Sequence, residues 1–576
     1  MHPNRIALKP YLERIQEFCR PLSEEELTGV VAGLAKDVST SERVGFLEKL
    51  ESMIPDSGPS GISDGSEVDK LLYDIEALRE SIEERAESIE NGDYWDDPDF
   101  YDEDGYDDED PDYVTEDQRE EIADLFMEVQ SLFMDGRLEK ARQVYDLLFE
   151  LVEYIKSVSY FSSPEDLDIR EERANYARCV FETSESKERL PMFVEAMAVF
   201  GSSPYAGNRF YDDKFPLLQE VVDAREGAME GLDVFLPEWK AFLNRHETSS
   251  RAASLLLEAV HLTDGMAGVS SLARKWQNSQ PRGYLFWLEL LKKENEPSKI
   301  IEIGKEALDA LEDGLFRERV AEFLIHAARE QNDPDYLLLG IRERFFSERS
   351  DQNLLELVGE ATRQNRRDEE IEGVLRFFEG GGKGDSDLVL FTKVLLMAGK
   401  LDEAFSVAKN EKALGWSSGN VGVVFGAVLR SLSGWSQKTP AIDRLLGSYA
   451  DKVDVYSGRI SVENGETPTF LTEILKGLQQ GRNIQQHAET YLSWAEKIGK
   501  SRIDGIVSNQ HRKAYNRAAQ VLGSLAETLI AMGNEKKALA LLRRYYHEKY
   551  NRHSAFRREV KSVVAGSALL RGCGFL

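Results

Sequence analysis

Apolar residues recur every three to four positions along most of the chain, which is the spacing of helices with one apolar face. The pattern resumes at Val114 after a polar stretch and continues almost to the C-terminus, and shorter segments of it precede that stretch. No segment alternates apolar and polar residues as a half-buried strand would. The pattern therefore predicts a nearly all-α chain.

One helix–turn–helix pattern recurs at least three times. It consists of an apolar helix end, a glycine that closes the helix, and a second helix with an alanine five residues after the glycine. The three pairs are Gly136 and Ala141, Gly399 and Ala404, and Gly533 and Ala538. A small side chain at that place lets the second helix cross the first closely. We therefore expect these alanines to be buried between paired helices.

The same kind of turn position recurs through the middle of the chain. Glycine and asparagine tolerate the left-handed backbone that closes a helix, and here they stand at intervals of 30, 37, 33, 34 and 35 residues. The positions are Gly265, Asn295, Asn332, Asn365, Gly399 and Gly434. An interval near 34 residues is the period of tetratricopeptide (TPR) helix pairs and predicts a TPR-like α-solenoid. The Trp, Gly and Pro positions of the TPR consensus are mostly unfilled, and the alternative is a helical bundle whose loops have this spacing by chance.

Composition divides the chain into five segments. Residues 1–54 are predicted to be an N-terminal helical unit, and residues 55–90 combine a Gly/Pro/Ser linker with a charged helix. Residues 91–117 form an acidic linker that contains aromatic residues. Residues 118–200 are predicted to be a first TPR-like helical segment, and residues 201–576 a TPR-like α-solenoid with basic C-terminal helices.

Charge is distributed unevenly along the chain. The formal net charge is −33, from 71 basic and 104 acidic residues. Residues 93–121 contain 16 acids and one base, whereas residues 501–576 contain 14 bases and 5 acids. The negative total favours solubility and disfavours general binding to nucleic acid or anionic lipid. No apolar run approaches the ~20 residues of a membrane helix, and no signal-peptide pattern opens the chain, so we expect a soluble cytoplasmic protein.

The acidic segment is the first candidate interaction site. Among its carboxylates it carries the aromatic residues Tyr94, Trp95, Phe100, Tyr101 and Tyr106. Acids and rings in alternation can bind a basic groove in extended form, because the rings are buried there and the charges steer the approach. Three interpretations are open: a plain linker, a docking segment for a protein, and a mimic of a nucleic-acid backbone. Prolines and glycines within the segment argue against the rigid frame that a mimic needs.

The basic C-terminal helices are the second candidate. The candidate docking residues there are Arg543, Arg544, Tyr546, Arg552, Arg557 and Arg558. Interleaved arginines and rings suit nucleic acid, with charges for phosphates and rings for base stacking. They equally suit an amphipathic terminal helix whose rings pack inside, and we favour this interpretation because the chain as a whole is acidic. Its charged face would then suit either the acidic stretch of the same chain, residues 91–117, or an acidic partner.

Catalytic and metal-binding motifs are incomplete. The GxSxG sequence around Ser63 has no strand before it, and the glycine-rich loop around Lys383 departs from the phosphate-binding pattern. An EF-hand loop centred on Gly105 would need ligands where Phe100 and Pro111 stand. The three cysteines lie far apart, and no HExxH sequence occurs. We therefore expect no enzymatic activity, no cofactor and no metal site.

The C-terminal half resembles a known family. Residues 509–563 (NQHRKAYNRAAQVLGSLAETLIAMGNEKKALALLRRYYHEKYNRHSAFRREVKSV) contain a Lys-Ala-Tyr helix start, an Ala-rich helix pair and a basic helix, and residues 343–364 (ERFFSERSDQNLLELVGEATRQ) precede them in the helical array. Both segments resemble the helical region of bacterial SWIM zinc finger proteins, and the resemblance covers residues 230–560. The family's finger needs a Cys-x-Cys and Cys-x-His ligand set that this sequence lacks. The resemblance therefore implies only a helical-repeat scaffold.

These patterns predict a non-enzymatic scaffold or adaptor that binds a protein partner. The binding surface would be the TPR-like helical array, with residues 91–117 as a docking element. The alternative is a nucleic-acid-associated accessory protein that acts through the basic C-terminal helices. The sequence does not identify the partner.

Overall fold

The computed structural model describes residues 64–91, 112–158, 167–200, 215–382, 387–410, 420–451, 469–481 and 484–575, with a few isolated positions before residue 31. All regular structure in these ranges is helical and no strand occurs among them, which confirms the all-α prediction. Within the same ranges, no helix is long and apolar enough to cross a membrane. Most of the predicted N-terminal unit and residues 92–111 of the acidic segment lie outside the described residues.

The chain divides into two compact units, Met1–Trp287 and Leu288–Leu576, and the boundary falls within α12 (Arg282–Lys293). The helices before α12 are α4 (Asp64–Asn91), α5 (Glu116–Met134), α6 (Leu138–Val158), α7 (Ile169–Thr183), α8 (Arg189–Ala196), α9 (Leu218–Asp223), α10 (Leu232–Arg245) and α11 (Ser250–Trp276). In this unit α5 packs on α6 and α6 packs on α7. The charged helix α4 contributes Leu71, Ile75, Leu78 and Ile82 to the same core, because these residues recur on one face.

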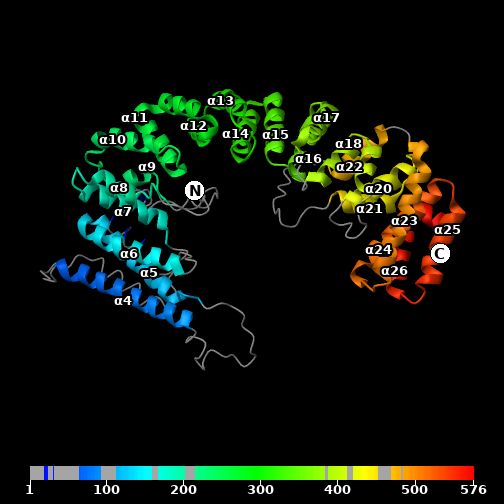
Figure 1. Cartoon of the computed structure of the whole chain (residues 1–576), viewed down its shortest axis with the longest axis horizontal. Coiled ribbons are helices and arrows are strands. Elements are labelled where there is room, and N and C mark those ends of the chain that lie inside the picture. The colour runs from blue at the N-terminus through cyan, green and yellow to red at the C-terminus, as the bar shows by residue number, and fades with distance from the viewer. Residues whose placement is uncertain are drawn as a thin grey trace. The chain divides into compact units, whose positions relative to one another are not determined.

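The second unit begins with a run of helices that pack neighbour against neighbour (Figure 1). These are α13 (Pro297–Ala310), α14 (Leu315–Gln331), α15 (Pro334–Ser347), α16 (Asp351–Arg363) and α17 (Arg367–Phe377). These helices approach each other most closely where one of them carries a small residue. A Cβ atom added at Gly340 of α15 would lie 2.8 Å from a side-chain carbon of Ile325 in α14, so only glycine allows this spacing.

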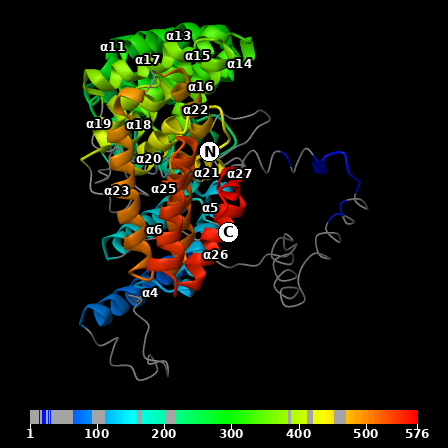
Figure 2. The ribbon, with the colours of Figure 1, turned by 90° about the vertical axis from the view of Figure 1, so that its right-hand side faces the viewer.

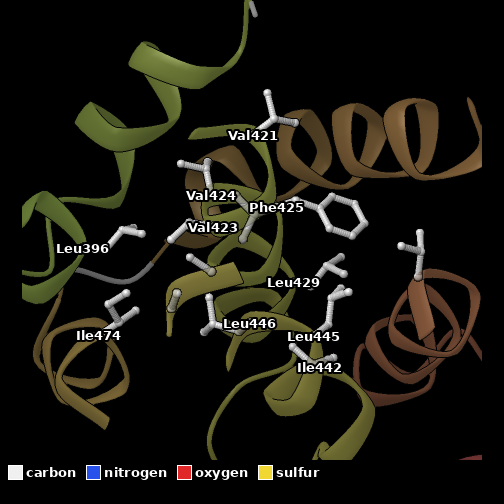
Figure 3. Packing of buried hydrophobic residues seen from close by; sticks show 14 of the residues in the cluster. Leu396, Val421, Val423, Val424, Phe425, Leu429, Ile442, Leu445, Leu446 and Ile474 are labelled. Carbon is white, nitrogen blue, oxygen red and sulfur yellow. The ribbon is translucent and has the colours of Figure 1, made fainter. Parts of the chain in front are cut away.

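The rest of the second unit is organised differently. Its helices are α18 (Leu388–Met397), α19 (Leu401–Ala408), α20 (Asn420–Leu432), α21 (Pro440–Ala450), α22 (Phe470–Gln480), α23 (Ala488–Val507), α24 (Tyr515–Ala531), α25 (Glu535–Arg543), the π-helix η9 (Arg544–Lys549), α26 (Ser554–Ala565) and α27 (Ala568–Gly572). Helix α20 contacts α18, α19, α21, α22, α23 and α24. Its residues 420–430 are all buried, and Figure 3 shows Val424, Phe425 and Leu429 among side chains of the surrounding helices. Helices α18, α19 and α21 to α24 therefore pack around one central helix, and α25, α26 and α27 pack on α24.

Every turn position predicted from glycine and asparagine has a positive φ, between 52° and 82°. At most of these turns the residue after the Gly or Asn donates its backbone N–H to a carbonyl five residues earlier, a Schellman motif. Examples are Arg137 to Leu132 at 3.0 Å and Arg366 to Ala361 at 2.7 Å. Gly265 differs, since it lies at a kink inside α11 rather than between two separate helices. Ala141, Ala404 and Ala538 are fully buried, as expected.

Candidate interaction surface

The acidic candidate site can be placed only at its edges. Its aromatic residues, Tyr94, Trp95, Phe100, Tyr101 and Tyr106, lie outside the described residues. At its C-terminal edge, Asp112 forms an ion pair with Arg119 of α5 at 3.2 Å. Thr115 caps α5, because its hydroxyl oxygen accepts the Gln118 backbone N–H while the Gln118 side chain accepts the Thr115 N–H. The segment therefore ends in a well-defined helix start.

The basic candidate site lies on α25, η9 and α26, which are on the face of the second unit shown in Figure 2. Its rings point inward: Tyr545, Tyr546, Tyr550 and Phe556 are all buried. The ring of Tyr546 lies 5.4 Å from that of Phe575, centre to centre, and the guanidinium of Arg557 lies 4.4 Å from its centre. Tyr546, which we predicted as a docking residue, therefore packs within the unit, as in the amphipathic-helix interpretation.

The arginines of this site point outward. Arg543, Arg544, Arg552 and Arg558 are exposed, and Arg557 is half-buried. Within the described part of the chain Arg543, Arg544 and Arg552 have no ion pair, and Arg558 has only a contact of 3.7 Å with Glu559. Sequence reasoning missed Lys536, which is exposed, has no ion pair in the same ranges, and lies two turns before Arg543 on one helix face. We call Lys536, Arg543, Arg544, Arg552 and Arg558 the C-terminal cationic surface.

Most arginines of α14 to α17 behave in the opposite way, and in the described ranges only Arg376, which is exposed near the end of α17, has no ion pair. Every arginine from Arg317 to Arg367, a range that the structure describes in full, forms at least one ion pair. These arginines are Arg317, Arg319, Arg329, Arg342, Arg344, Arg349, Arg363, Arg366 and Arg367. Several pairs join different helices of the array, such as Arg317 of α14 with Glu343 of α15 and Arg342 of α15 with Glu370 of α17, each at 2.5 Å. The pairs therefore contribute to the alignment of the array.

A surface hollow lies beside the turn between α12 and α13. It is lined by Lys292, Asn295, Glu296, Pro297, Ile300, Phe323, His326 and Glu330. The Lys292 ammonium lies 5.9 Å from the centre of the Phe323 ring, and His326 Nδ1 lies 3.3 Å from Glu330 Oε1. One ring is thus surrounded by groups of both charges. Such a lining suits a side chain of a bound peptide better than it suits bond-breaking chemistry.

Buried carboxyl groups were not foreseen, because glutamate in a charged helix gives no indication of burial, and four of them bridge elements as follows. Glu172 accepts hydrogen bonds from the Tyr145 hydroxyl at 2.6 Å and from Gln130 at 3.0 Å, and burial raises its pKa to about 8. Glu473 forms an ion pair with Arg367 at 2.6 Å and is fully buried. These groups connect helices inside each unit and offer no open site.

Two of these carboxyl groups cap the start of another helix. Glu258 of α11 accepts the backbone N–H groups of Leu218 and Gln219 at 2.6 and 2.7 Å, and burial raises its pKa to about 7. Glu527 of α24 accepts those of Ala441 and Ile442, both at 3.0 Å. The first N–H groups of a helix have no partner within it, so a carboxylate at that end is stabilising.

The residues considered for chemistry are only partly described. Ser63 and Lys383 lie outside the described residues. Burial raises the pKa of the Cys179 thiol well above its usual range, which suppresses the thiolate needed for reactivity. In the described ranges, no three His, Cys, Asp or Glu side chains are grouped as ligands of a metal ion.

Comparison with known proteins adds no family. No family model matches the chain, and no curated protein matches it in sequence. The resemblance of residues 509–563 to SWIM zinc finger proteins therefore stays a hypothesis.

Proposed function

We propose that this chain is a non-enzymatic scaffold that binds another protein through a TPR-like array of helix pairs. The observation that carries the proposal is the recurrence of one helix-closing turn at Asn295, Asn332, Asn365 and Gly399, with positive φ at each. Stacked helix pairs of this kind present extended surfaces that suit peptides and domains. Residues 91–117 would serve as a further docking element.

The hollow beside α14 is the proposed contact point of the array. Phe323 supplies an apolar surface, while Lys292, His326 and Glu330 surround it with hydrogen-bonding and charged groups. An anchoring side chain in an otherwise polar rim is the usual composition of a binding hot spot. The paired arginines of α14 to α17 would keep the helices on either side in fixed positions.

The test uses immobilised full-length chain and lysate of the cells that produce it. Retained proteins are identified by mass spectrometry, purified and titrated against wild type and the double variant Phe323→Ala/His326→Ala. We expect the double variant to bind its partner roughly tenfold more weakly, the size typical of a hot-spot truncation. The control is Lys438→Ala/Lys497→Ala, at two exposed lysines remote in sequence from the hollow. The absence of any partner retained in amounts comparable with the chain itself would count against a scaffold.

A nucleic-acid-associated role is the second candidate. It is favoured by the exposed arginines of the C-terminal cationic surface, and arginine is well suited to phosphate. The burial of Tyr545 and Tyr546 removes the rings that would stack on bases. Titration with a single-stranded oligonucleotide tests it directly, with a steep loss of binding as salt rises as the expected result.

A further inference from the structure

We infer that the C-terminal cationic surface binds a carboxylate-rich segment of a partner protein. The inference deepens the proposed scaffold function and rests on it, because it names the chemistry of one partner contact. It concerns α25, η9 and α26 only and is independent of the hollow beside α14.

The first argument is the lack of compensating charge. Residues 535–575 contain ten bases and three acids. Two of these bases are paired, Lys537 with Glu496 and Lys549 with Asp504. The exposed arginines named above have no comparable partner in the described ranges. Arg543 and Arg544 are adjacent in the chain, and Arg557 over the Tyr546 ring places the start of α26 against η9, so unpaired positive charges gather here and produce a potential that attracts carboxylates.

The second argument is that the arginines project from a firm surface. Beneath them, Tyr550 donates its hydroxyl to Asp504 Oδ1 at 2.8 Å, and the Phe556 ring lies 5.9 Å from that of Tyr550. The π-helical turn of η9 lets two successive rings, Tyr545 and Tyr546, both face inward. Turns of this kind often occur at functional sites. A packed support reduces the ordering cost of binding.

The third argument distinguishes carboxylates from nucleic acid. Glu548 and Glu559 lie among the arginines, so the positive surface is interrupted. A nucleic-acid strand extends its charge well beyond such a patch and meets a chain whose net charge is −33. A short acidic peptide engages only the patch. Each guanidinium can also hold one carboxylate with two parallel hydrogen bonds.

The experiment measures fluorescence anisotropy of a labelled peptide in which glutamate alternates with glycine. Full-length wild type is compared with Arg543→Glu/Arg544→Glu/Arg552→Glu. The matched control, Lys293→Glu/Arg376→Glu/Lys438→Glu, reverses three other exposed bases and has the same net charge. Circular dichroism and thermal melts establish that all three proteins are folded. A glutamine–glycine peptide and a single-stranded oligonucleotide of equal length are titrated in parallel.

We expect the surface variant to bind the glutamate peptide roughly tenfold more weakly than wild type, because three exposed charge contacts are lost, and the control to stay close to wild type. Equal binding of the glutamine peptide, or no binding of the glutamate peptide by wild type, would overturn the inference. Tighter binding of the oligonucleotide through the same arginines would overturn it in favour of nucleic acid. The scaffold proposal has a separate readout: its partner is tested at Phe323 and His326, so either proposal can fail alone.

Discussion

Two arginine-rich regions of the second unit use the same side chain in opposite ways. From α14 to α17, nine of the ten arginines form ion pairs, several of them with another helix, and in the described ranges only Arg376 of α17 has none. On α25, η9 and α26, the exposed arginines lie above buried tyrosines and lack such partners in the described ranges. The two regions differ in how many carboxylates lie near their arginines. Arginines with a carboxylate partner hold helices together, and arginines without one are available to a ligand.

Loss of the carboxylate from the most buried pair should have the largest effect. Arg367 is 11% exposed and Glu473 is fully buried. Glu473→Ala removes the buried carboxylate and leaves the Arg367 guanidinium with only the exposed Asp368 and backbone carbonyls, so we expect the free energy of unfolding to fall by about 3–5 kcal/mol. Urea denaturation of the full chain measures it. Glu559→Ala is the control from the other region, where the contact is long and exposed, and equal losses in the two variants would contradict the comparison.

A half-buried pair between α15 and α17 should matter less. Arg342→Ala removes the partner of Glu370, which is 4% exposed, and the buried carboxylate is left with fewer donors. We expect a loss of about 1–3 kcal/mol in the free energy of unfolding, the cost of an unsatisfied buried group. Arg544→Ala is the matched substitution on the cationic surface and should lose no stability. A comparable loss for Arg544→Ala would mean that this arginine also has a structural partner.

The first unit contains a buried carboxyl group, Glu172, whose hydrogen-bond partners are neutral side chains rather than an arginine. Burial raises the pKa of Glu172 to about 8 from its ordinary 4.5, so the folded unit keeps the proton that the unfolded chain releases. This stability is fully present below pH 4.5 and is lost as pH rises toward 8, by up to about 1.4 kcal/mol per pH unit. Thermal melts from pH 5 to 8 measure the slope. Glu172→Gln should flatten it, whereas Glu185→Gln, at an exposed position after the same helix, should leave it unchanged.

The sequence allowed some of these features to be predicted and not others. Turns at Asn332 and Gly399 depend on local backbone preference, so glycine and asparagine mark them reliably. The pair between Arg367 and Glu473 joins residues 106 positions apart, and nothing local to either indicates it. Helix α20 had a usable indication, because NVGVVFGAVLRSL is apolar on nearly all sides. A repeat spacing of 34 residues does not by itself indicate that α20 is buried on all sides by other helices.

The candidate site was predicted in composition and only partly in orientation. The arginines were expected to be accessible, and Arg543, Arg544, Arg552 and Arg558 are exposed. Tyr546 lies inside because η9 is a π-helix, whose wider turn changes which residues face inward. The spacing of an ideal α-helix cannot anticipate that change. The sequence does show fewer acids beside the second arginine group, but which carboxylate pairs with which arginine is set by tertiary packing.

The smallest expected change, a shift in the thermal midpoint, is also the most decisive, because the shift should have opposite signs in the two regions. Arg329 is exposed and paired with Glu356 at 3.1 Å, so Arg329→Gln removes an attraction. Arg544 is exposed beside Arg543, so Arg544→Gln removes a repulsion. We expect the thermal midpoint to fall slightly for the first and rise slightly for the second at low salt, each change corresponding to less than about 1 kcal/mol. High salt screens exposed charges and should bring both variants to the wild-type value. Shifts of the same sign would show that the arginines of the C-terminal cationic surface are compensated after all.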